Sequence, residues 1–264
     1  MHTRYGTLRR VRGRLLDVAG RRPLTLAVVV TLLWHLILFA VEGTLPPLSP
    51  DWFPSLGAVV VNLVLAALTV GLLRWLGWVR QAGLGWRRPD RSWWLAAPLL
   101  VEGMLYGVTG FDTSANTLTS VALMKLTVGL AEESLSRGLV QRVLTPLGPA
   151  AAAVWVGVLF GLGHALSGWW FGRAWDETMS VVISAGCYGF CLAALRWHLG
   201  TIWPLVLLHA LTDFTQLATP GSLLFVVRLG LVLALVGYGW WLLRLLDRRP
   251  DRLRLATTGA VGSS

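Results

Sequence analysis

Apolar stretches dominate this chain of 264 residues. Several of them are close to the roughly 20 residues that a helix needs to span a hydrocarbon core. Only 14% of the residues are charged, against about a quarter in soluble domains. We therefore predict an all-α, polytopic membrane protein with about eight transmembrane helices. The expected spans cover residues 24–41, 56–73, 93–109, 119–143, 150–167, 178–195, 201–217 and 223–243.

The basic residues are concentrated on one side of this arrangement. Arginines crowd the segment before the first span, the loop after the second span and the segment after the last span, whereas acidic residues dominate the opposite loops. Because positive charge is retained in the cytoplasm, we predict a multi-pass protein of the cell (plasma) membrane with both termini cytoplasmic, N-in and C-in. The net charge of +10 also favours contact with anionic membrane lipids, and no nucleic-acid partner is expected.

The chain is expected to form one membrane domain between two polar ends. Residues 1–22 are a basic cytoplasmic N-terminal segment, residues 23–245 are the transmembrane domain, and residues 246–264 are a disordered cytoplasmic tail. Three motifs with ionisable side chains lie within about residues 118–217. Such side chains are expensive inside a bilayer and usually have a function there, so this region is the predicted catalytic core.

The first motif combines two adjacent glutamates with an arginine. Glu133 and Arg137 are four residues apart, share a helix face and are expected to form an ion pair. Glu132 lies about 140° around the helix from Arg137 and is not neutralised by it. Glu132 is therefore a candidate general base. Taken alone, this motif is equally compatible with a buried ion pair that only fixes helix packing.

Two later motifs each place side chains four residues apart on one helix face. Phe160 and His164 enclose two glycines that permit close approach of another helix. His209 is followed by Asp213, and an acid at this spacing can hold an imidazole in one tautomer and orientation. His35, in the first expected span, has no acidic partner at helical spacing and is predicted to be a structural residue.

Together, the motifs predict a hydrolytic site inside the bilayer. If the spans converge, Glu132 and His164 would activate a water molecule. His209 and Asp213 would polarise the scissile carbonyl or stabilise its oxyanion. A zinc alternative stays open, because a carboxylate and two imidazoles can hold zinc with one position free. Its ligands would be Glu132, His164 and His209, although the chain lacks the H-E-x-x-H spacing.

In these motifs the chain resembles the CPBP family, the CAAX prenyl proteases and bacteriocin-processing enzymes that are also called the Abi family. The resemblance covers about residues 118–217 and rests on three elements in order: Glu132-Glu133-x-x-x-Arg137-Gly138, Phe160-x-x-x-His164, and Trp203-Pro204 through His209-x-x-x-Asp213. It implies an intramembrane glutamic endopeptidase, a hydrolase that cleaves a membrane-anchored peptide or protein without a metal or other cofactor.

The resemblance also implies a role for each matching residue. Glu132 would be the base, His164 its partner on the attacking water, and His209 with Asp213 the oxyanion side. The supporting residues would be Glu133, Arg137 and Phe160. Two positions depart from the family pattern. Asp213 stands where many members have Asn, and a charged acid there would weaken oxyanion stabilisation. Ser136 stands where an aromatic residue commonly precedes the arginine.

Two other classes of function are compatible with the sequence. A non-catalytic membrane scaffold or bacteriocin self-immunity protein would keep the fold and lose the chemistry. A proton-coupled transporter would use intramembrane Glu, His and Asp as a relay, but no inverted repeat is found. Arginine supplies 22 of the 23 basic residues, a bias typical of GC-rich genomes, so a bacterial source is expected.

Overall fold

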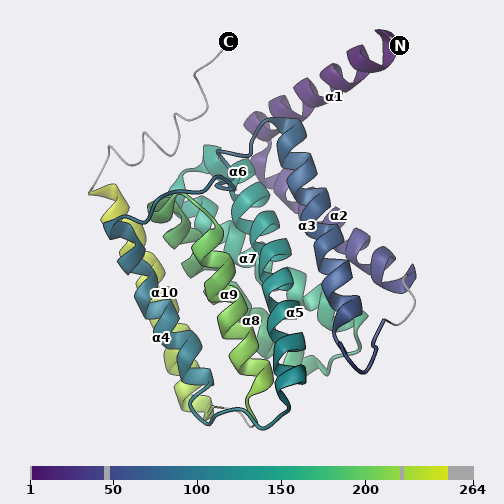
Figure 1. Ribbon diagram of the computed structural model, residues 1–264. Coiled ribbons are helices and arrows are strands. Elements are labelled where there is room, and N and C mark those ends of the chain that lie inside the picture. The colour runs from purple at the N-terminus through teal and green to yellow at the C-terminus, as the bar shows by residue number, and fades with distance from the viewer. Residues whose placement is uncertain (1, 45–47, 221–222, 249–264) are drawn as a thin grey trace.

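The computed structural model describes residues 2–44, 48–220 and 223–248, and it is helical throughout, with no strand among these residues (Figure 1). A 3-10 turn at Arg91–Ala96 precedes α4, and another at Thr145–Leu147 precedes α7. The α-helices are α1 (His2–Arg21), α2 (Pro23–Thr44), α3 (Leu56–Leu76), α4 (Ala97–Tyr106), α5 (Ala115–Glu133), α6 (Gln141–Leu144), α7 (Pro149–Trp170), α8 (Trp175–Leu199), α9 (Trp203–Ala218) and α10 (Phe225–Asp247).

Five of these helices are long and apolar enough to cross a membrane: α2, α3, α7, α8 and α10. The predicted all-helical membrane protein is confirmed at this level. The other three expected spans fall on shorter or interrupted helices. α4 has 10 residues and α9 has 16, while α5 is interrupted at Ser134 by a different helical form. The eight-span count and the N-in, C-in orientation are therefore not confirmed.

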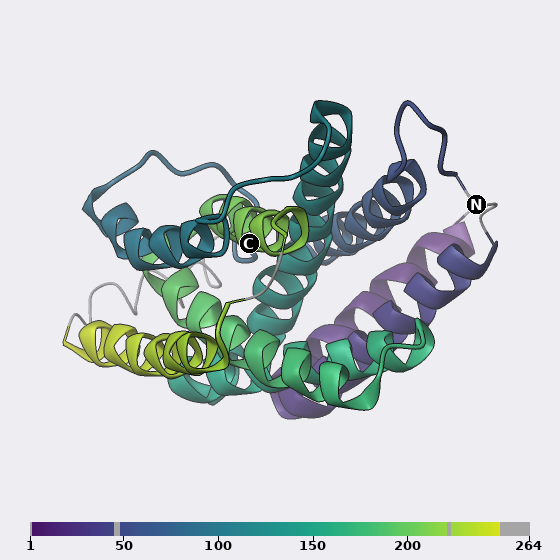
Figure 2. The same cartoon turned by 90° about the horizontal axis from the view of Figure 1, so that it is seen from below.

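The helices that carry the three motifs pack against one another in the interior of the bundle. α5 contacts α3 and α9, and α7 contacts α8 and α2. Views from the side and from below agree that α5 lies next to α9 (Figures 1 and 2). Gly161 explains the close contact between α7 and α8, since a Cβ atom there would lie 2.6 Å from the carbonyl oxygen of Val182. The close helix approach expected at this glycine is confirmed.

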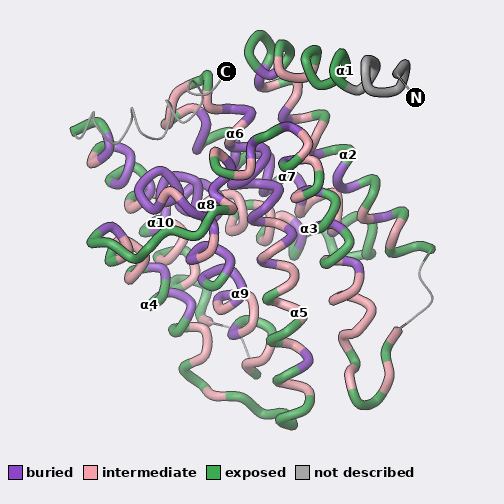
Figure 3. Tube along the Cα trace, turned by 45° about the horizontal axis from the view of Figure 1, so that its top comes forward, coloured by how far each residue is buried: buried purple, intermediate pink, exposed green. Residues whose placement is uncertain are grey.

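Burial is uneven along the bundle (Figure 3). Every residue of 133–141 and 188–199 is buried, whereas the loop between α4 and α5 is mostly exposed. The motif residues therefore lie at the edge of the most enclosed part of the molecule. An ionisable group there has to be satisfied by protein groups or by a few trapped waters, because bulk water is excluded.

The arginine-rich segments meet at one end of the bundle. Arg12 of α1 donates to the carbonyl of Leu76 at 3.1 Å, at the end of α3. Arg196, near the end of α8, donates to the carbonyl of Gln81 at 3.2 Å, in the loop that follows α3. The segments predicted to be cytoplasmic thus share one end. Residues 249–264, most of the predicted disordered tail, lie outside the described part of the chain, and α10 extends to Asp247.

Candidate active site

The two glutamates stand where the helix changes form. α5 ends at Glu133, and Ser134–Val140 continue as a π-helix in which the amide of Gln141 bonds to the carbonyl of Ser136, five residues earlier. π-Helical turns are rare and often occur at functional sites. Glu132 and Glu133 are adjacent in sequence and both belong to the last turn of α5. Their side chains nevertheless point into different surroundings.

Glu133 and Arg137 form a fully buried ion pair. Arg137 Nη1 donates to Glu133 Oε1 at 2.6 Å, and neither side chain is exposed to solvent. Arg137 Nη2 also donates to the carbonyl of Gly189 on α8 at 3.1 Å. The predicted pairing is confirmed. The pair also connects α5 to α8, which a surface pair on a single helix would not do.

Phe160 packs between the charged and the imidazole groups. The Arg137 guanidinium lies 4.5 Å from the centre of its ring, a cation–π contact. The ring centres of His164 and His209 lie 4.8 and 5.8 Å from that of Phe160, both edge to face. Phe160 therefore contacts Arg137 and both histidines, and its ring restricts the planes of the two imidazoles.

His209 is held by Glu133. Its Nδ1 atom donates to Glu133 Oε1 at 2.8 Å, and its side chain is almost fully buried. The sequence predicted Asp213 as the group that orients this imidazole, and the structure corrects that prediction: Asp213 Oδ1 lies 3.8 Å from the other ring nitrogen, Nε2. The buried ion pair lies within reach of Nδ1, whereas one helical turn on α9 places Asp213 beside Nε2.

Glu132 lies on the Nε2 side of His209. Its Oε2 atom is 3.7 Å from Nε2, and it has no hydrogen-bond partner among the described residues. Nε2 thus faces two carboxylates, Glu132 and Asp213, at distances too long for a direct hydrogen bond. Because both neighbours are acceptors, a proton on Nε2 is favoured, and that N–H is available to another acceptor.

Lys125 completes this side of the site. Its Nζ atom donates to Asp213 Oδ2 at 3.0 Å, and the two side chains keep exposures of 20% and 28%. Lys125 is seven residues before Glu132, two turns along α5, so both face α9. Lys125 belongs to none of the three sequence motifs, although its seven-residue spacing from Glu132 indicates that both side chains share a helix face.

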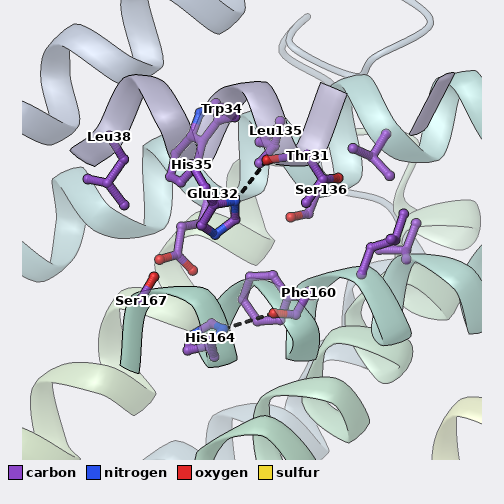
Figure 4. Close-up of a pocket in the computed structure, with 13 residues that line it drawn as sticks. Thr31, Trp34, His35, Leu38, Glu132, Leu135, Ser136, Phe160, His164 and Ser167 are labelled. Atoms are coloured by element: carbon purple, nitrogen blue, oxygen red, sulfur yellow. Dashed lines mark hydrogen bonds between the residues drawn. The ribbon is translucent and has the colours of Figure 1, made fainter. Parts of the chain in front are cut away.

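A small pocket of about 40 Å³ opens on the other side of Glu132, between α2, the π-helical segment and α7 (Figure 4). It admits water but not a peptide. Polar groups from all three elements reach it. Its lining includes Thr31, Trp34, His35, Leu38, Glu132, Leu135, Ser136, Phe160, His164 and Ser167.

Two imidazoles reach this pocket in the same way. His164 Nδ1 donates to the carbonyl of Phe160 at 2.9 Å, and His35 Nδ1 donates to the carbonyl of Thr31 at 2.8 Å. A carbonyl can only accept, so each ring carries a proton on Nδ1. Figure 4 shows the Glu132 carboxylate between the two rings. His35 therefore lines the pocket beside Glu132, while its structural role stays a prediction.

Gly163 is the reason that α2 can bring His35 so close. A Cβ atom at position 163 would lie 2.7 Å from both Cε1 and Nε2 of His35. The approach of α2 to α7 is a tertiary feature, and no local spacing in the sequence signals it. The pocket-lining role of Ser136, a position where the chain departs from the family pattern, depends on the same packing.

The predicted site residues thus form one continuous centre with two sides. Glu132 and His164 line the pocket, while His209 and Asp213 lie outside it and face Glu132 from α9. Among the described residues, no group of three His, Cys, Asp or Glu side chains is arranged to hold a metal ion. The alternative in which Glu132, His164 and His209 hold zinc stays a prediction, which the chelator experiment below tests.

The fold and the site define a helical membrane protein with a polar centre made of carboxylates, imidazoles and their cationic partners. Residues 114–215 match the family model described as "Type II CAAX prenyl endopeptidase Rce1-like". Over these residues the chain is similar to the Rce1-like domain of the CPBP family, and the predicted resemblance is confirmed. The family supports a membrane protease type of function and does not favour the scaffold or transporter alternatives. No curated protein and no solved structure gave a significant match.

Proposed function

We propose that the protein is an intramembrane glutamic endopeptidase that cleaves a membrane-anchored peptide or protein with water activated by Glu132. The observation that carries this proposal is the position of the Glu132 carboxylate. One side of it lines a water-sized pocket that it shares with His164, and its Oε2 atom lies 3.7 Å from His209 Nε2 on the other side. A base between a water site and a hydrogen-bond donor is the arrangement that hydrolysis of a carbonyl needs.

The reaction follows from the donors and acceptors. A water in the pocket donates one hydrogen to Glu132 and the other to the Nε2 lone pair of His164. Glu132 removes a proton as the water oxygen attacks the scissile carbonyl carbon. The carbonyl oxygen becomes an oxyanion and accepts from Nε2–H of His209. Glu132 then returns the proton to the amide nitrogen, the C–N bond breaks, and an amine and a carboxylic acid result.

The buried pair behind His209 prepares it for this role. Glu133 accepts from Nδ1–H and so orients the ring with Nε2 toward the reacting carbonyl. Arg137 neutralises Glu133. No group has to reorganise as charge develops on the substrate oxygen, which is the condition under which hydrogen-bond donors stabilise a transition state most.

The substrate class follows from the family and the location of the site. The matched family acts as a CAAX prenyl endopeptidase, so a prenylated peptide is the first candidate. A leader-bearing peptide and a C-terminal membrane anchor are further candidates. The arginine-rich end of the bundle is proposed to face the cytoplasm, in the cell membrane, in contact with anionic lipids.

The test is cleavage of a pool of prenylated and membrane-anchored peptides by the purified protein in detergent, with mass-spectrometric readout. Wild type should release a defined product in the presence and absence of a chelator, and Glu132→Ala should release none. Loss of cleavage with chelator would show that a metal is required. Equal cleavage by Glu132→Ala would contradict the assignment of the base.

A further inference from the structure

Lys125 is the only lysine in a chain that uses arginine at the other 22 of its 23 Lys and Arg positions. It lies inside the bundle on α5, and its ammonium group is directed at Asp213 across the contact with α9, at 3.0 Å. An ammonium group is a compact point charge that can sit beside one carboxylate oxygen, whereas a guanidinium is a planar fork that fills more space. The site therefore contains a second ion pair, and unlike Glu133–Arg137 this pair joins two helices, α5 and α9.

The Lys125–Asp213 pair changes the balance of charge around His209. The centre holds three carboxylates (Glu132, Glu133 and Asp213) and three cations: Lys125, Arg137 and His209, which is an imidazolium when both of its ring nitrogens donate. Arg137 is committed to Glu133 at 2.6 Å. Without Lys125, the His209 imidazolium alone would face two carboxylates, which lie 3.7 and 3.8 Å from its Nε2 atom, and one negative charge would be left uncompensated in the centre. Charges that are screened weakly by solvent interact strongly, and a free carboxylate there would oppose a developing oxyanion.

We propose that Lys125 is a positioning residue that neutralises Asp213, so that an acid at position 213 is compatible with an oxyanion site at His209 Nε2. Lys125 holds Oδ2 of Asp213, and Asp213 places Oδ1 beside Nε2 of His209. The Asp–Lys pair then serves as a net-neutral neighbour of the imidazole. This inference rests on the proposed protease function and adds to it a residue outside the three sequence motifs.

The packing of α5 on α9 supports a rigid pair. Between Lys125 and Glu132 on α5 lies Gly129, where a Cβ atom would be only 2.9 Å from the carbonyl oxygen of Val206 on α9. The two helix backbones therefore approach closely next to the ion pair. The partial exposure of both side chains, 20% and 28%, places the pair at the edge of the site, where a substrate carbonyl can approach.

The experiment is a double-substitution cycle on purified protein, using the peptide that wild type cleaves. Lys125→Met should lower kcat about 10- to 100-fold with KM little changed, somewhat less than the roughly 10²- to 10³-fold loss seen when an oxyanion donor itself is removed. Lys125→Arg should retain more activity than Lys125→Met. Lys125→Met/Asp213→Asn should recover kcat at least severalfold over Lys125→Met, because the uncompensated carboxylate is gone.

Asp213→Asn alone closes the cycle, and the control is Arg228→Met. Arg228 is another basic residue within an apolar helix, but it binds Ser180 and lies outside the site. Wild-type kcat for Lys125→Met, or a double variant no better than Lys125→Met, would overturn the proposal. Failure of wild type to cleave any peptide would count against the protease function instead. In that case the same four proteins are compared by thermal unfolding in detergent. A lower Tm in Lys125→Met that the double variant restores supports the neutralising pair, and an additive result overturns it.

Discussion

The pocket side and the α9 side of Glu132 contain different kinds of side chain. The pocket side uses two imidazoles, His35 and His164, and each donates from Nδ1 to a carbonyl of its own helix. The α9 side uses charges in pairs, Glu133 with Arg137 and Asp213 with Lys125, arranged around His209. Imidazoles suit a water molecule that has to lose a proton. Paired charges suit a place where negative charge develops, because they hold a donor in position without adding net charge.

Glu132 differs from Glu133 in its ionic contacts, since the ion pair it makes among the described residues is with His209 at 3.7 Å. A carboxylate tied to an arginine at 2.6 Å, as Glu133 is, is a weak base. Glu132 is 22% exposed and its Oε2 is unpartnered among the described residues. Two adjacent glutamates thus have separate tasks because the helix directs one into the protein interior and the other to the border between the two sides.

The largest expected effect comes from removing the group that both sides share. Glu132→Gln keeps the size of the side chain and removes the base, so kcat should fall by about 10³-fold, within the range of roughly 10²- to 10⁴-fold for general acid–base groups. Folding should be retained. Steady-state cleavage and thermal unfolding of the same preparation measure both. Glu42→Gln, which alters an exposed glutamate bonded to Trp170, is the matched control.

The next effect concerns the stability of the paired-charge side. Glu133→Ala leaves a fully buried Arg137 without its partner and should lower the free energy of unfolding by about 3–5 kcal/mol. Glu133→Leu/Arg137→Leu should recover most of that stability, because no unpaired charge is left, and yet remain inactive because His209 loses its Nδ1 partner. Chemical unfolding in detergent tests the first statement and peptide cleavage the second. An active double variant would show that Glu133 does not orient His209.

The two pocket imidazoles should differ in importance. His164→Ala should lower kcat by about 10²-fold, since His164 receives a hydrogen bond from the attacking water. His35→Ala should lower kcat by about tenfold, because His35 faces the same pocket but belongs to α2, farther from α9. Added imidazole should partly restore activity to each variant. Equal losses would indicate that both rings bind the same water, and no effect of His35→Ala would limit that residue to packing.

The smallest expected effect comes from changing the packing around His35 without removing any group of the site. Gly163→Ala places a methyl group 2.7 Å from the His35 ring, so the ring or α2 has to move. We expect a loss of about 1–3 kcal/mol in stability, as for other overpacked sites, and a severalfold loss of kcat. Gly237→Ala on α10, where a Cβ atom would meet nothing within 4 Å, should be neutral or slightly stabilising. A Gly163→Ala protein with full activity would show that the position of His35 is not critical.

Sequence reasoning was most successful where chemistry is local to one helix. The Glu133–Arg137 pair at four-residue spacing and the close helix approach at Gly161 are both confirmed. The motif order also led to the correct family. These features depend only on helical periodicity and side-chain size, which a sequence contains.

What the sequence missed depends on contacts between helices. Glu133, not Asp213, holds His209 Nδ1, because α5 and α9 pack in a register that no local spacing reveals. His35 comes from a helix that lies outside the matched segment, and it reaches Glu132 only because α2 packs on Gly163. Lys125 was visible as a charge in an apolar stretch, but its partner lies 88 residues away in the chain. The sequence also did not indicate how short α4 and α9 are, with 10 and 16 residues, and the eight-span count stays a prediction.

A single turnover in H₂¹⁸O tests most directly whether Glu132 activates water and does not attack the substrate itself. Enzyme in excess over a cleavable peptide is quenched after one turnover, and mass spectrometry then locates the label. The account predicts ¹⁸O in the new carboxyl group of the peptide product and none in the enzyme fragment that contains Glu132. Label in the Glu132 side chain with an unlabelled product would mean that an anhydride had formed, and this would contradict the account.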